Sequence, residues 1–391
     1  MTINKDIFDT IYHPPVLASD DLAVLRLLEK QKEQLRPYTQ NEPKRWWGTL
    51  RRVSSARATQ GSNSIEGYFA SLDEIRAIGE RATPEPDRRE TWDAVAGYRR
   101  AMTYLVRTAQ EGRVGFDMRF LKSVHYMMLE HELNKNPGQW RQRPIYITNK
   151  QGEIVYEGVE ASEISRLMQA LVQSVLQPLD TTPLAVRAAM AHLNLVMIHP
   201  FSDGNGRMAR ALQTFILARE ADLHPVFSSI EEWLGANTEQ YYQILEQMSD
   251  GHWKPETDTA PWVRFCLKAH YQQMQKVLER IDHLGKFADE IEAWVHRKNL
   301  PERCIIPLLN TAQGYSLTRQ RYEADASIGA ATAQRDLSLL VAADFLAASG
   351  EKRGRRYVAS DSLGALYAQT RPKKKIIDPY ELLAEDSSRL L

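Results

Sequence analysis

The chain has 391 residues, of which 43% are hydrophobic, so it is long enough for two or three domains with a sizeable core. Its 50 Lys and Arg residues balance its 50 Asp and Glu residues, which excludes a strong overall charge that would draw it to nucleic acid or a membrane. The two cysteines, Cys266 and Cys304, fit a reducing cytoplasm better than a disulfide framework. Because no export signal and no membrane-spanning apolar run is visible, we expect a cytoplasmic protein with no membrane partner.

Residues 1–88 are predicted to form an N-terminal segment that contains the run S-N-S-I-E-G at positions 62–67. Ser62 and Glu66 are four residues apart and therefore share one face of a helix. Gly67 is a natural stop for that helix, so Glu66 would be presented at its end, where a carboxylate can pair with a guanidinium group. The alternative is an ordinary solvated helix. The run S-L-D-E at 71–74 is a capping box that starts the next helix.

Residues 89–285 predict a mostly helical bundle, because apolar side chains recur there at helical spacing. Helices are expected at residues 90–110, 116–129, 161–177, 184–198 and 261–284. Residues 145–148 and 153–156 are instead rich in strand-forming types on both sides of a Gly-containing turn, which predicts a hairpin. Because two strands alone are marginal in water, this hairpin either serves the site or decorates the surface.

The helix over residues 184–198 is apolar on nearly every face and is predicted to be buried at the centre of the bundle. Pro183 suits the first helical position, where its missing N–H costs nothing. Pro200 disfavours helical geometry at His199, so the helix should end close to His199. Taken alone, this histidine has the ordinary interpretation of a structural residue.

Residues 203–210, D-G-N-G-R-M-A-R, predict a turn and then a second helix from Arg207 onward. Gly204 and Gly206 permit positive φ and close approach of the backbone to a ligand. Arg207 and Arg210 fall on one face of the second helix. A helix N-terminus flanked by two guanidinium groups is suited to bind an anion. Singly, these residues are equally compatible with a turn and a solvated helix.

Residues 286–370 predict a winged helix-turn-helix domain, because two short helices at 316–324 and 330–342 precede strand-like runs at 345–347 and 357–359. The turn between these strands and the second helix carry basic residues, namely Lys352, Arg353, Arg355, Arg356 and Arg335. These groups suit DNA phosphates, but winged helices also bind proteins, so both alternatives stay open. Residues 371–391, with Lys373, Lys374 and Lys375, are expected to be a solvated extension.

The run H-P-F-S-D-G-N-G-R-M-A-R at 199–210 resembles the signature of the Fic family, H-P-F-x-[DE]-G-N-G-R-x-x-R, at every specified position. The resemblance implies a Fic-type helical bundle with a β-hairpin flap and transfer of AMP from ATP to hydroxyl side chains of proteins, including the chain itself. The run at 62–67 is similar to the family's inhibitory pattern, [ST]-x-x-x-E-[GN], which implies an N-terminal inhibitory helix within the same chain.

The resemblance also implies individual roles. His199 would be the general base, and Asp203 would hold Mg²⁺. Asn205 would cradle phosphate oxygens, Arg207 would stabilise the leaving pyrophosphate, and Arg210 would bind the γ-phosphate. The implied ATP-binding set is Glu66, Ile145, Tyr146, Ile147, Thr148, Asp203, Gly204, Asn205, Gly206, Arg207, Arg210, Tyr241 and Tyr242.

Paired with Arg210, Glu66 would deprive the γ-phosphate of its anchor and so inhibit the enzyme. In similar proteins the same glutamate also supports removal of AMP, for which Glu66 would position water. The hairpin would align the target segment by strand-like pairing, and Tyr241 and Tyr242 would line the adenine and ribose pocket, although a core or surface position is an equal alternative. Self-regulating relatives commonly form homodimers. The competing class of function is a DNA-binding regulator that uses the Fic-like part as a nucleotide sensor.

Overall fold

The computed structural model describes residues 10–40, 46–80, 82–111, 115–149, 151–177, 182–220, 225–350, 355–372 and 375–389. Its α-helices are α2 (Ser19–Leu35), α3 (Pro37–Gln40), α4 (Trp47–Ile65), α5 (Leu72–Gly79), α6 (Arg89–Glu111), α7 (Met118–Leu129), α8 (Ile164–Leu176), α9 (Leu184–Ile198), α10 (Asn205–Glu220), α11 (Pro225–Ser228), α12 (Glu231–Ala236), α13 (Thr238–Ser249), α14 (Ala260–Arg297), α15 (Ile305–Ala312), α16 (Arg319–Ala326), α17 (Ala330–Ala342), α18 (Asp361–Gln369) and α19 (Pro379–Arg389). Short 3-10 turns lie at Pro86–Arg88, Leu133–Lys135, Ala161–Glu163 and Glu302–Cys304. The strands are β1 (Tyr146–Thr148), β2 (Ile154–Glu157), β3 (Leu346–Ser349) and β4 (Arg356–Ala359).

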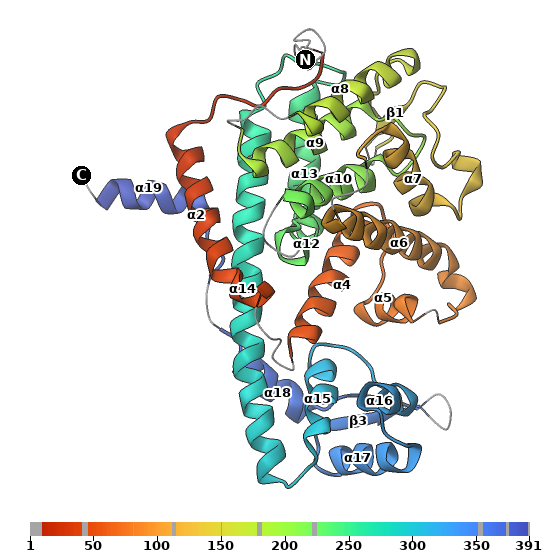
Figure 1. Cartoon of the computed structure of the whole chain (residues 1–391), viewed down its shortest axis with the longest axis vertical. Helices are drawn as coiled ribbons and strands as arrows, with labels where there is room; N and C mark the ends of the chain where they lie inside the picture. The colour runs from red at the N-terminus through yellow and green to blue at the C-terminus, as the bar shows by residue number, and fades with distance from the viewer. Residues whose placement is uncertain are drawn as a thin grey trace.

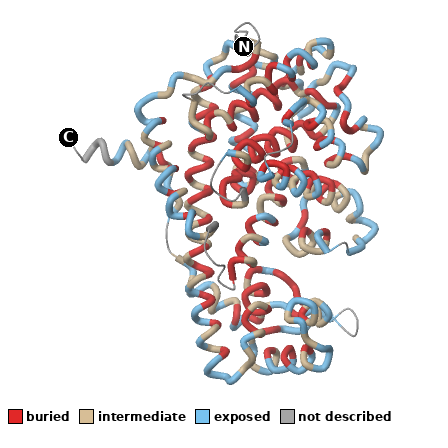
Figure 2. Tube along the Cα trace, in the orientation of Figure 1, coloured by how far each residue is buried: buried red, intermediate tan, exposed pale blue. Residues whose placement is uncertain are grey.

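Helices α9 and α10 lie at the centre of the larger, helical part of the molecule (Figures 1 and 2). Between residues 185 and 198 every residue of α9 except Arg187 is buried, which confirms the predicted central helix. Pro183 is the N-cap and not the first helical residue, because its ψ of 145° is extended. Helix α10 begins at Asn205, two residues earlier than predicted.

The hairpin predicted over residues 145–156 is present as antiparallel β1 and β2. Its second strand starts at Ile154 and ends at Glu157, one residue later than expected. The hairpin does not stand alone, because Tyr156 is buried and its hydroxyl donates to the Met197 carbonyl at 2.5 Å. The Glu157 N–H also donates to the Gly251 carbonyl at 2.9 Å. These bonds fix the two strands against the end of α9 and the residues after α13.

Helix α4 carries the 62–67 run and ends where the sequence indicates, with Glu66 as the C-cap and Gly67 at φ 86°. Its C-terminal part packs against α12 at unusually short range. A Cβ built on Gly61 would lie 2.4 Å from the Glu231 carbonyl oxygen, and one on Gly235 would lie 2.4 Å from the Gly61 Cα. Only glycine permits this approach, so two glycines set the position of the helix that presents Glu66.

The next helix, α5, starts as predicted. Ser71 Oγ accepts from the Glu74 N–H, and the Glu74 carboxylate accepts from the Ser71 N–H, which confirms the capping box. Helix α2 was not anticipated from the sequence. It packs on α14 through a stripe that includes Val24, Leu28 and Leu35.

Helix α14 runs without interruption from Ala260 to Arg297 and lies along both parts of the molecule (Figure 1). The predicted end at residue 284 is wrong, because its buried stripe continues through Phe287, Ile291 and Val295. The boundary predicted between residues 285 and 286 therefore falls inside a continuous helix.

The C-terminal part consists of α15, α16, α17, the antiparallel pair β3 and β4, and α18. Helix α16 starts at Arg319, three residues after the predicted start, because Thr318 caps it through the Arg321 N–H. Leu317 makes an isolated bridge to Tyr357 of β4. Lys352 and Arg353 of the predicted basic turn lie outside the described residues, whereas Arg335, Arg355 and Arg356 are exposed.

The prediction of a solvated extension after residue 370 is wrong for helix α19 and Asp378, whereas Arg371 and Lys375 are exposed. Helix α19 packs on α2 and α14. Tyr380 donates its hydroxyl hydrogen to Asp21 Oδ1 at 3.1 Å, and Asp378 lies 2.7 Å from Lys268 Nζ. Tyr380 and Asp378 make these tertiary contacts within a segment whose polar composition predicts exposure to solvent. Lys373 and Lys374 lie outside the described residues.

Within the described part of the chain, no helix combines the length and apolarity needed to cross a membrane. Cys266 and Cys304 are buried free thiols.

The Gly61 contact predicts a selective loss of stability. Gly61→Ala should lower the free energy of unfolding in urea by about 1–3 kcal/mol, because the added methyl group overpacks the α4–α12 contact. Gly48→Ala in the same helix is the matched control. Its Cβ would meet only the flexible end of Arg52, at 3.2 Å, so stability should stay equal or rise by up to about 1 kcal/mol. Equal stability of Gly61→Ala and the unmodified chain would contradict the proposed packing constraint.

Candidate functional site

His199 is the C-cap of α9 and adopts a left-handed conformation, with φ 51°. Its Nδ1 lies 3.0 Å from the Val196 carbonyl oxygen. Because a carbonyl only accepts, Nδ1 carries the hydrogen, and Nε2 of the neutral ring keeps its lone pair. Desolvation by burial lowers the pKa of His199, and nearby Arg141 lowers it further. The imidazole is therefore held in the form that can accept a proton.

Arg141 braces the chain around His199 and was given no role in the sequence-based prediction. Its Nε donates to the His199 carbonyl at 2.8 Å, and its backbone N–H donates to the Pro200 carbonyl at 2.9 Å. Nη2 also donates to the Val159 carbonyl. One buried guanidinium thus joins the segment after the hairpin to the histidine. Local sequence cannot reveal this role, since the three acceptors are backbone carbonyls distant in the chain.

The loop after His199 is supported from below by His125 of α7, another residue that the sequence did not single out. The His125 ring stacks on Phe201 with 3.6 Å between centroids. Its Nδ1 accepts from the Gly138 N–H at 2.8 Å, so Nε2 carries the hydrogen and donates to the Asp203 carbonyl at 2.9 Å. Desolvation lowers the pKa of His125 to about 4, consistent with a neutral ring.

Asn205 closes the same loop with its side-chain amide. Oδ1 accepts from the Phe201 N–H and Nδ2 donates to the Phe201 carbonyl, each at 2.9 Å. Both ends of the amide are therefore occupied by the backbone, and the structure gives Asn205 a bracing role. The turn requires glycine at position 204, because φ is 73° there and a Cβ would lie 2.7 Å from the Leu129 side chain.

Arg207 is the strongest indication that this site suits an anion. Its side chain is 1% exposed, yet Nε and Nη1 have no hydrogen-bond partner among the described residues. The guanidinium lies over the Tyr68 ring at 5.2 Å from its centroid. A buried cation without an acceptor is costly, and phosphate oxygens are well-matched acceptors for its planar donors.

Arg210, one turn further along α10, is already occupied by the end of α4. Its Nε donates to Ser62 Oγ at 2.8 Å, and its Nη2 donates to the Ser62 carbonyl at 2.9 Å and to Glu66 Oε1 at 2.6 Å. Burial opposes the charged form of Arg210, but the Glu66 carboxylate outweighs it and raises the pKa above the usual guanidinium value.

The Glu66 carboxylate also lies against the first turn of α10. A Cβ built on Gly206 would be 2.5 Å from Glu66 Oε1. Free N–H groups and the positive end of the dipole favour an anion at this place. Glu66 therefore lies at a place that suits an anion, and we call the Ser62–Glu66–Arg210 contact the clamp.

Asp203 is the residue predicted to hold Mg²⁺. Its Oδ1 accepts from the Gly204 N–H at 2.5 Å, and its Oδ2 lies 3.2 Å from Lys135 Nζ. The described residues contain no group of three or more His, Cys, Asp or Glu side chains that could hold a metal ion. One partly exposed carboxylate nevertheless fits Mg²⁺, which is commonly bound through one or two carboxylates together with substrate phosphates and water.

The two tyrosines of the pair differ in exposure, although their ring centroids are 5.7 Å apart. Tyr241 is 1% exposed and its hydroxyl lies 2.8 Å from His192 Nε2, so it occupies the alternative core position and offers no open face to an adenine ring. Tyr242 is 49% exposed and donates its hydroxyl hydrogen to the Ile65 carbonyl at 3.1 Å. Tyr242 is thus beside Glu66 and stays a candidate for nucleotide contact.

The hairpin residues lie apart from the loop. Ile145 accepts from the Gly158 N–H through its carbonyl at 3.0 Å, Ile147 is half-buried, and Tyr146 and Thr148 are exposed. Within the described chain no hydrogen bond joins residues 145–148 to residues 199–210. Their contact with ATP stays a prediction.

Comparison with known proteins finds a family match over the part of the chain that contains the 199–210 loop. Residues 115–217 match the Fic/DOC family. This segment includes His125, the hairpin and the loop from His199, whereas Glu66 and α4 lie outside it. Curated relatives include "Protein adenylyltransferase Fic" of Nematostella vectensis, 28% identical over 210 residues (53% of this chain, 45% of the relative), and the protein of the same name in Aedes aegypti, 29% identical over 205 residues (52% and 38%). The match to this chain spans less than half the length of these two curated relatives.

Solved structures share the fold. A Fic family protein from Desulfovibrio desulfuricans aligns over 90% of this chain and 99% of its own, with a TM-score of 0.56 and 19% identity. A fragment of Fic-1 from C. elegans aligns over 67% of this chain and 72% of its own, with a TM-score of 0.52 and 22% identity. The mostly helical architecture is therefore that of Fic proteins.

The bracing role of Asn205 can be tested by stability. Asn205→Ala should lower the free energy of unfolding by about 1–3 kcal/mol, because it leaves the buried Phe201 N–H and carbonyl without partners. Asn237→Ala is the control, since the half-buried Asn237 side chain makes one bond, to the Trp233 carbonyl at 2.8 Å, and its loss should cost less. Chemical denaturation followed by circular dichroism gives both values, and equal losses would show that Asn205 does not brace the loop.

Proposed function

We propose that the chain is a protein adenylyltransferase that transfers AMP from ATP to Ser, Thr or Tyr hydroxyls of proteins, including its own, with release of pyrophosphate. The observation that carries the proposal is the 199–210 loop. A neutral histidine with a free Nε2 stands at its start, and a buried arginine with unpartnered donors follows at a helix N-terminus. The names of the curated relatives support AMP transfer as the reaction.

In this proposal His199 Nε2 takes the proton from the attacking hydroxyl, which then bonds to the α-phosphorus as pyrophosphate leaves. Arg207 stabilises the negative charge that develops on the leaving group, which provides the acceptor that its Nε and Nη1 lack. Asp203 would hold Mg²⁺ after releasing Lys135, and the metal when bound would neutralise phosphate charge. Arg210 would bind the γ-phosphate. Asn205 contributes indirectly, by keeping the loop closed.

We further propose that Glu66 inhibits the enzyme. With the clamp closed, Arg210 Nη2 is engaged by Glu66, and the carboxylate adds negative charge at the α10 N-terminus. A γ-phosphate entering this space would meet a like charge and an occupied anchor. ATP would then bind without its reactive α-phosphate in line with His199. Release of Glu66 would also leave a carboxylate free to position water, which supports AMP removal as a second activity of the same group.

The clamp predicts the outcome of a label-transfer assay with ATP labelled at the α- or the γ-phosphate and Mg²⁺. Glu66→Gly should raise α-label on protein about tenfold to a hundredfold, because hydrogen bonds to charged groups contribute roughly 1.5–3 kcal/mol. Adding His199→Ala to Glu66→Gly should abolish the transfer. Glu163→Gly is the control, since Glu163 directly precedes α8 and pairs with Arg166 in the same turn, and it belongs to neither the clamp nor the 199–210 loop.

Other outcomes would redirect the assignment. Equal transfer by Glu66→Gly and the unmodified chain would contradict the clamp, and γ-label on protein would indicate a kinase that binds ATP inverted. ATP binding without any label transfer would favour a nucleotide sensor.

The lowered pKa of His199 predicts the acid limb of the pH profile. For Glu66→Gly, kcat/KM should rise with pH as His199 loses its proton, with a midpoint below 6.5, the ordinary value for histidine. Only the neutral ring accepts a proton, and desolvation favours that form. The rate should therefore be level near neutral pH and fall in acid. A midpoint above 6.5 would contradict the assignment of His199 as a desolvated base.

For the C-terminal part we propose a winged helix-turn-helix, supported by the order α15–α16–α17–β3–β4 and the Leu317–Tyr357 bridge. The exposed Arg335, Arg355 and Arg356 suit DNA phosphates or an acidic protein surface. Membership of the self-inhibited class, formation of a homodimer and residence in the cytoplasm belong to the same proposal.

A further inference from the structure

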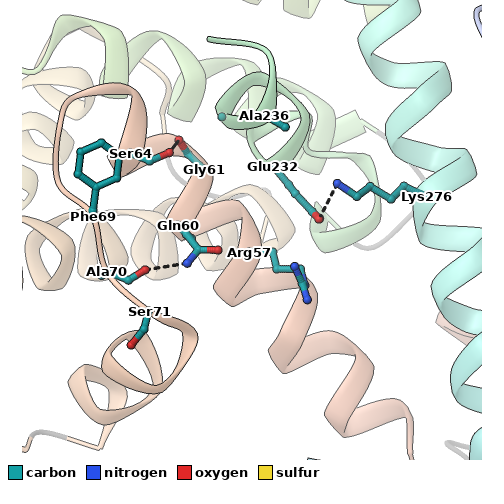
Figure 3. A pocket seen from close by; sticks show the side chains of 11 residues that line it. Arg57, Gln60, Gly61, Ser64, Phe69, Ala70, Ser71, Glu232, Ala236 and Lys276 are labelled. Carbon is teal, nitrogen blue, oxygen red and sulfur yellow. Dashed lines mark hydrogen bonds and ion pairs between the residues drawn. The ribbon is translucent and has the colours of Figure 1, made fainter. Parts of the chain in front are cut away.

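A pocket of about 510 Å³ lies on the side of α4 where the helix faces α12 and α14. Figure 3 shows Arg57, Glu232 and Lys276 towards one end and Phe69 at the other. Gly61 lines it between these ends. The pocket is separate from the 199–210 loop, none of whose residues line it.

The charged end of this pocket has more cations than its single carboxylate can serve. Glu232 accepts from Arg280 Nη2 with both oxygens, at 2.8 and 3.0 Å, and also from Gln273 at 3.2 Å. Lys276 Nζ is a further cation, 3.2 Å from Glu232 Oε1. Arg280 and Lys276 outweigh the effect of burial and lower the pKa of Glu232 to about 2, so this carboxylate is charged and fully engaged.

Arg57 is left without an acceptor. Its Nε is buried and has no hydrogen-bond partner among the described residues, and no ion pair joins it to them. Arg280 is close enough to lower the pKa of Arg57, in addition to the larger lowering by desolvation. Only Arg280 of these two neighbouring guanidinium groups is paired with the Glu232 carboxylate, and a partly buried cation such as Arg57 is stabilised by an added anion.

The other end of the pocket carries an exposed aromatic ring. Phe69 is 68% exposed, and Ser64 and Ala70 lie on its side of the pocket (Figure 3). An exposed aromatic ring beside small residues suits the flat hydrocarbon part of a ligand. Charge at one end and an apolar surface at the other are the features of a site for a small organic anion.

We propose that this pocket binds a small organic anion, whose phosphate or carboxylate contacts Arg57 and Lys276 and whose apolar body lies towards Phe69, and that its occupancy holds the clamp closed. The claim that occupancy holds the clamp closed rests on the proposed function. The claim that the pocket binds an organic anion does not.

The coupling to the clamp follows from the position of the pocket on α4. Gly61 and Ser64 line the pocket. Gly61 directly precedes Ser62, and Ser64 is two residues before Glu66. Residues 69–71, which follow the end of the helix, also line the pocket. The pocket exists only while α4 is docked on α12 through Gly61 and Gly235. A ligand that binds only this arrangement stabilises it in proportion to its occupancy.

Binding can be tested on the full chain with phenyl phosphate as the probe and benzyl alcohol as its neutral counterpart, by titration calorimetry. Phenyl phosphate should bind saturably, and Arg57→Gln and Lys276→Gln should each weaken binding at least tenfold. Arg280 and Gln273 still donate to Glu232 in both variants, so both variants should fold. Lys286→Gln, which alters an exposed lysine on the same helix, should bind as the unmodified chain does, and benzyl alcohol should not bind.

Arg207→Gln identifies binding at the wrong place, because the α10 N-terminus is also suited to phosphate. Affinity that disappears in Arg207→Gln but persists in Arg57→Gln would overturn the proposal. The proposal would also be overturned if phenyl phosphate showed no saturable binding at concentrations up to about 10 mM, because a Kd above that value is too weak to matter.

The effect on the clamp has a readout that needs no catalysis. At ten times its Kd, phenyl phosphate should slow opening-limited hydrogen exchange of the amides at residues 61–68 about elevenfold. In the label-transfer assay it should lower α-label transfer by the unmodified chain and leave Glu66→Gly unchanged. Binding that depends on Arg57 but leaves the hydrogen exchange of residues 61–68 unaltered would overturn the claim that the ligand holds the clamp closed. Absence of α-label transfer by every variant would refute the proposed function. The hydrogen-exchange measurement would then still test the effect of the pocket on the clamp.

Discussion

The need to provide acceptors for two buried guanidinium groups dominates this structure. Arg207 and Arg210 are each about 1% exposed, on the first turns of one helix. Burial removes the hydration of both guanidinium groups, and a desolvated charge is stable only beside an anion or a hydrogen-bond acceptor. Arg210 donates to Ser62 and Glu66 through Nε and Nη2 and has only Nη1 without a partner among the described residues, whereas both Nε and Nη1 of Arg207 lack one. The difference between the two arginines defines which part of the site is closed and which part is open to a ligand.

The rest of the fold positions these groups with little freedom. Backbone carbonyls that would otherwise be unsatisfied in the loop are served by Arg141, His125 and Asn205. On the opposite side, α4 reaches the arginine only because Gly61 and Gly235 let two helices touch. A buried network adds to this contact, since Glu231 accepts from Tyr98 at 2.7 Å and from Thr214 of α10 at 3.0 Å. The clamp is therefore part of the core packing, and under the proposed function it is also the element that would move for ATP to bind productively.

The C-terminal part is joined to the same segment. The Ser316 N–H donates to both Asp73 oxygens, at 2.8 and 3.1 Å, and Arg321 lies 2.9 Å from Glu80. Both acidic residues belong to the α5 region that follows the clamp, and α14 continues into the C-terminal part as one rigid helix. The C-terminal part and the pocket beside Arg57 therefore both contact α4 or the segment that follows it, and under the proposed function each would be a route of control over the clamp.

The sequence by itself determined the local features whose cause is local. Pro200 ends α9 at His199, Gly67 ends α4, and the capping box starts α5, because each depends on backbone geometry a few residues away. The central helix could also be foreseen from its continuous apolar run. Only the tertiary structure decided what depends on distant partners: the tautomer of His199, the bracing by His125 and Arg141, the burial of Tyr241, the length of α14 and the docking of α19. Those outcomes follow from which groups compete for acceptors and apolar cover after folding, and no short stretch of sequence contains that information.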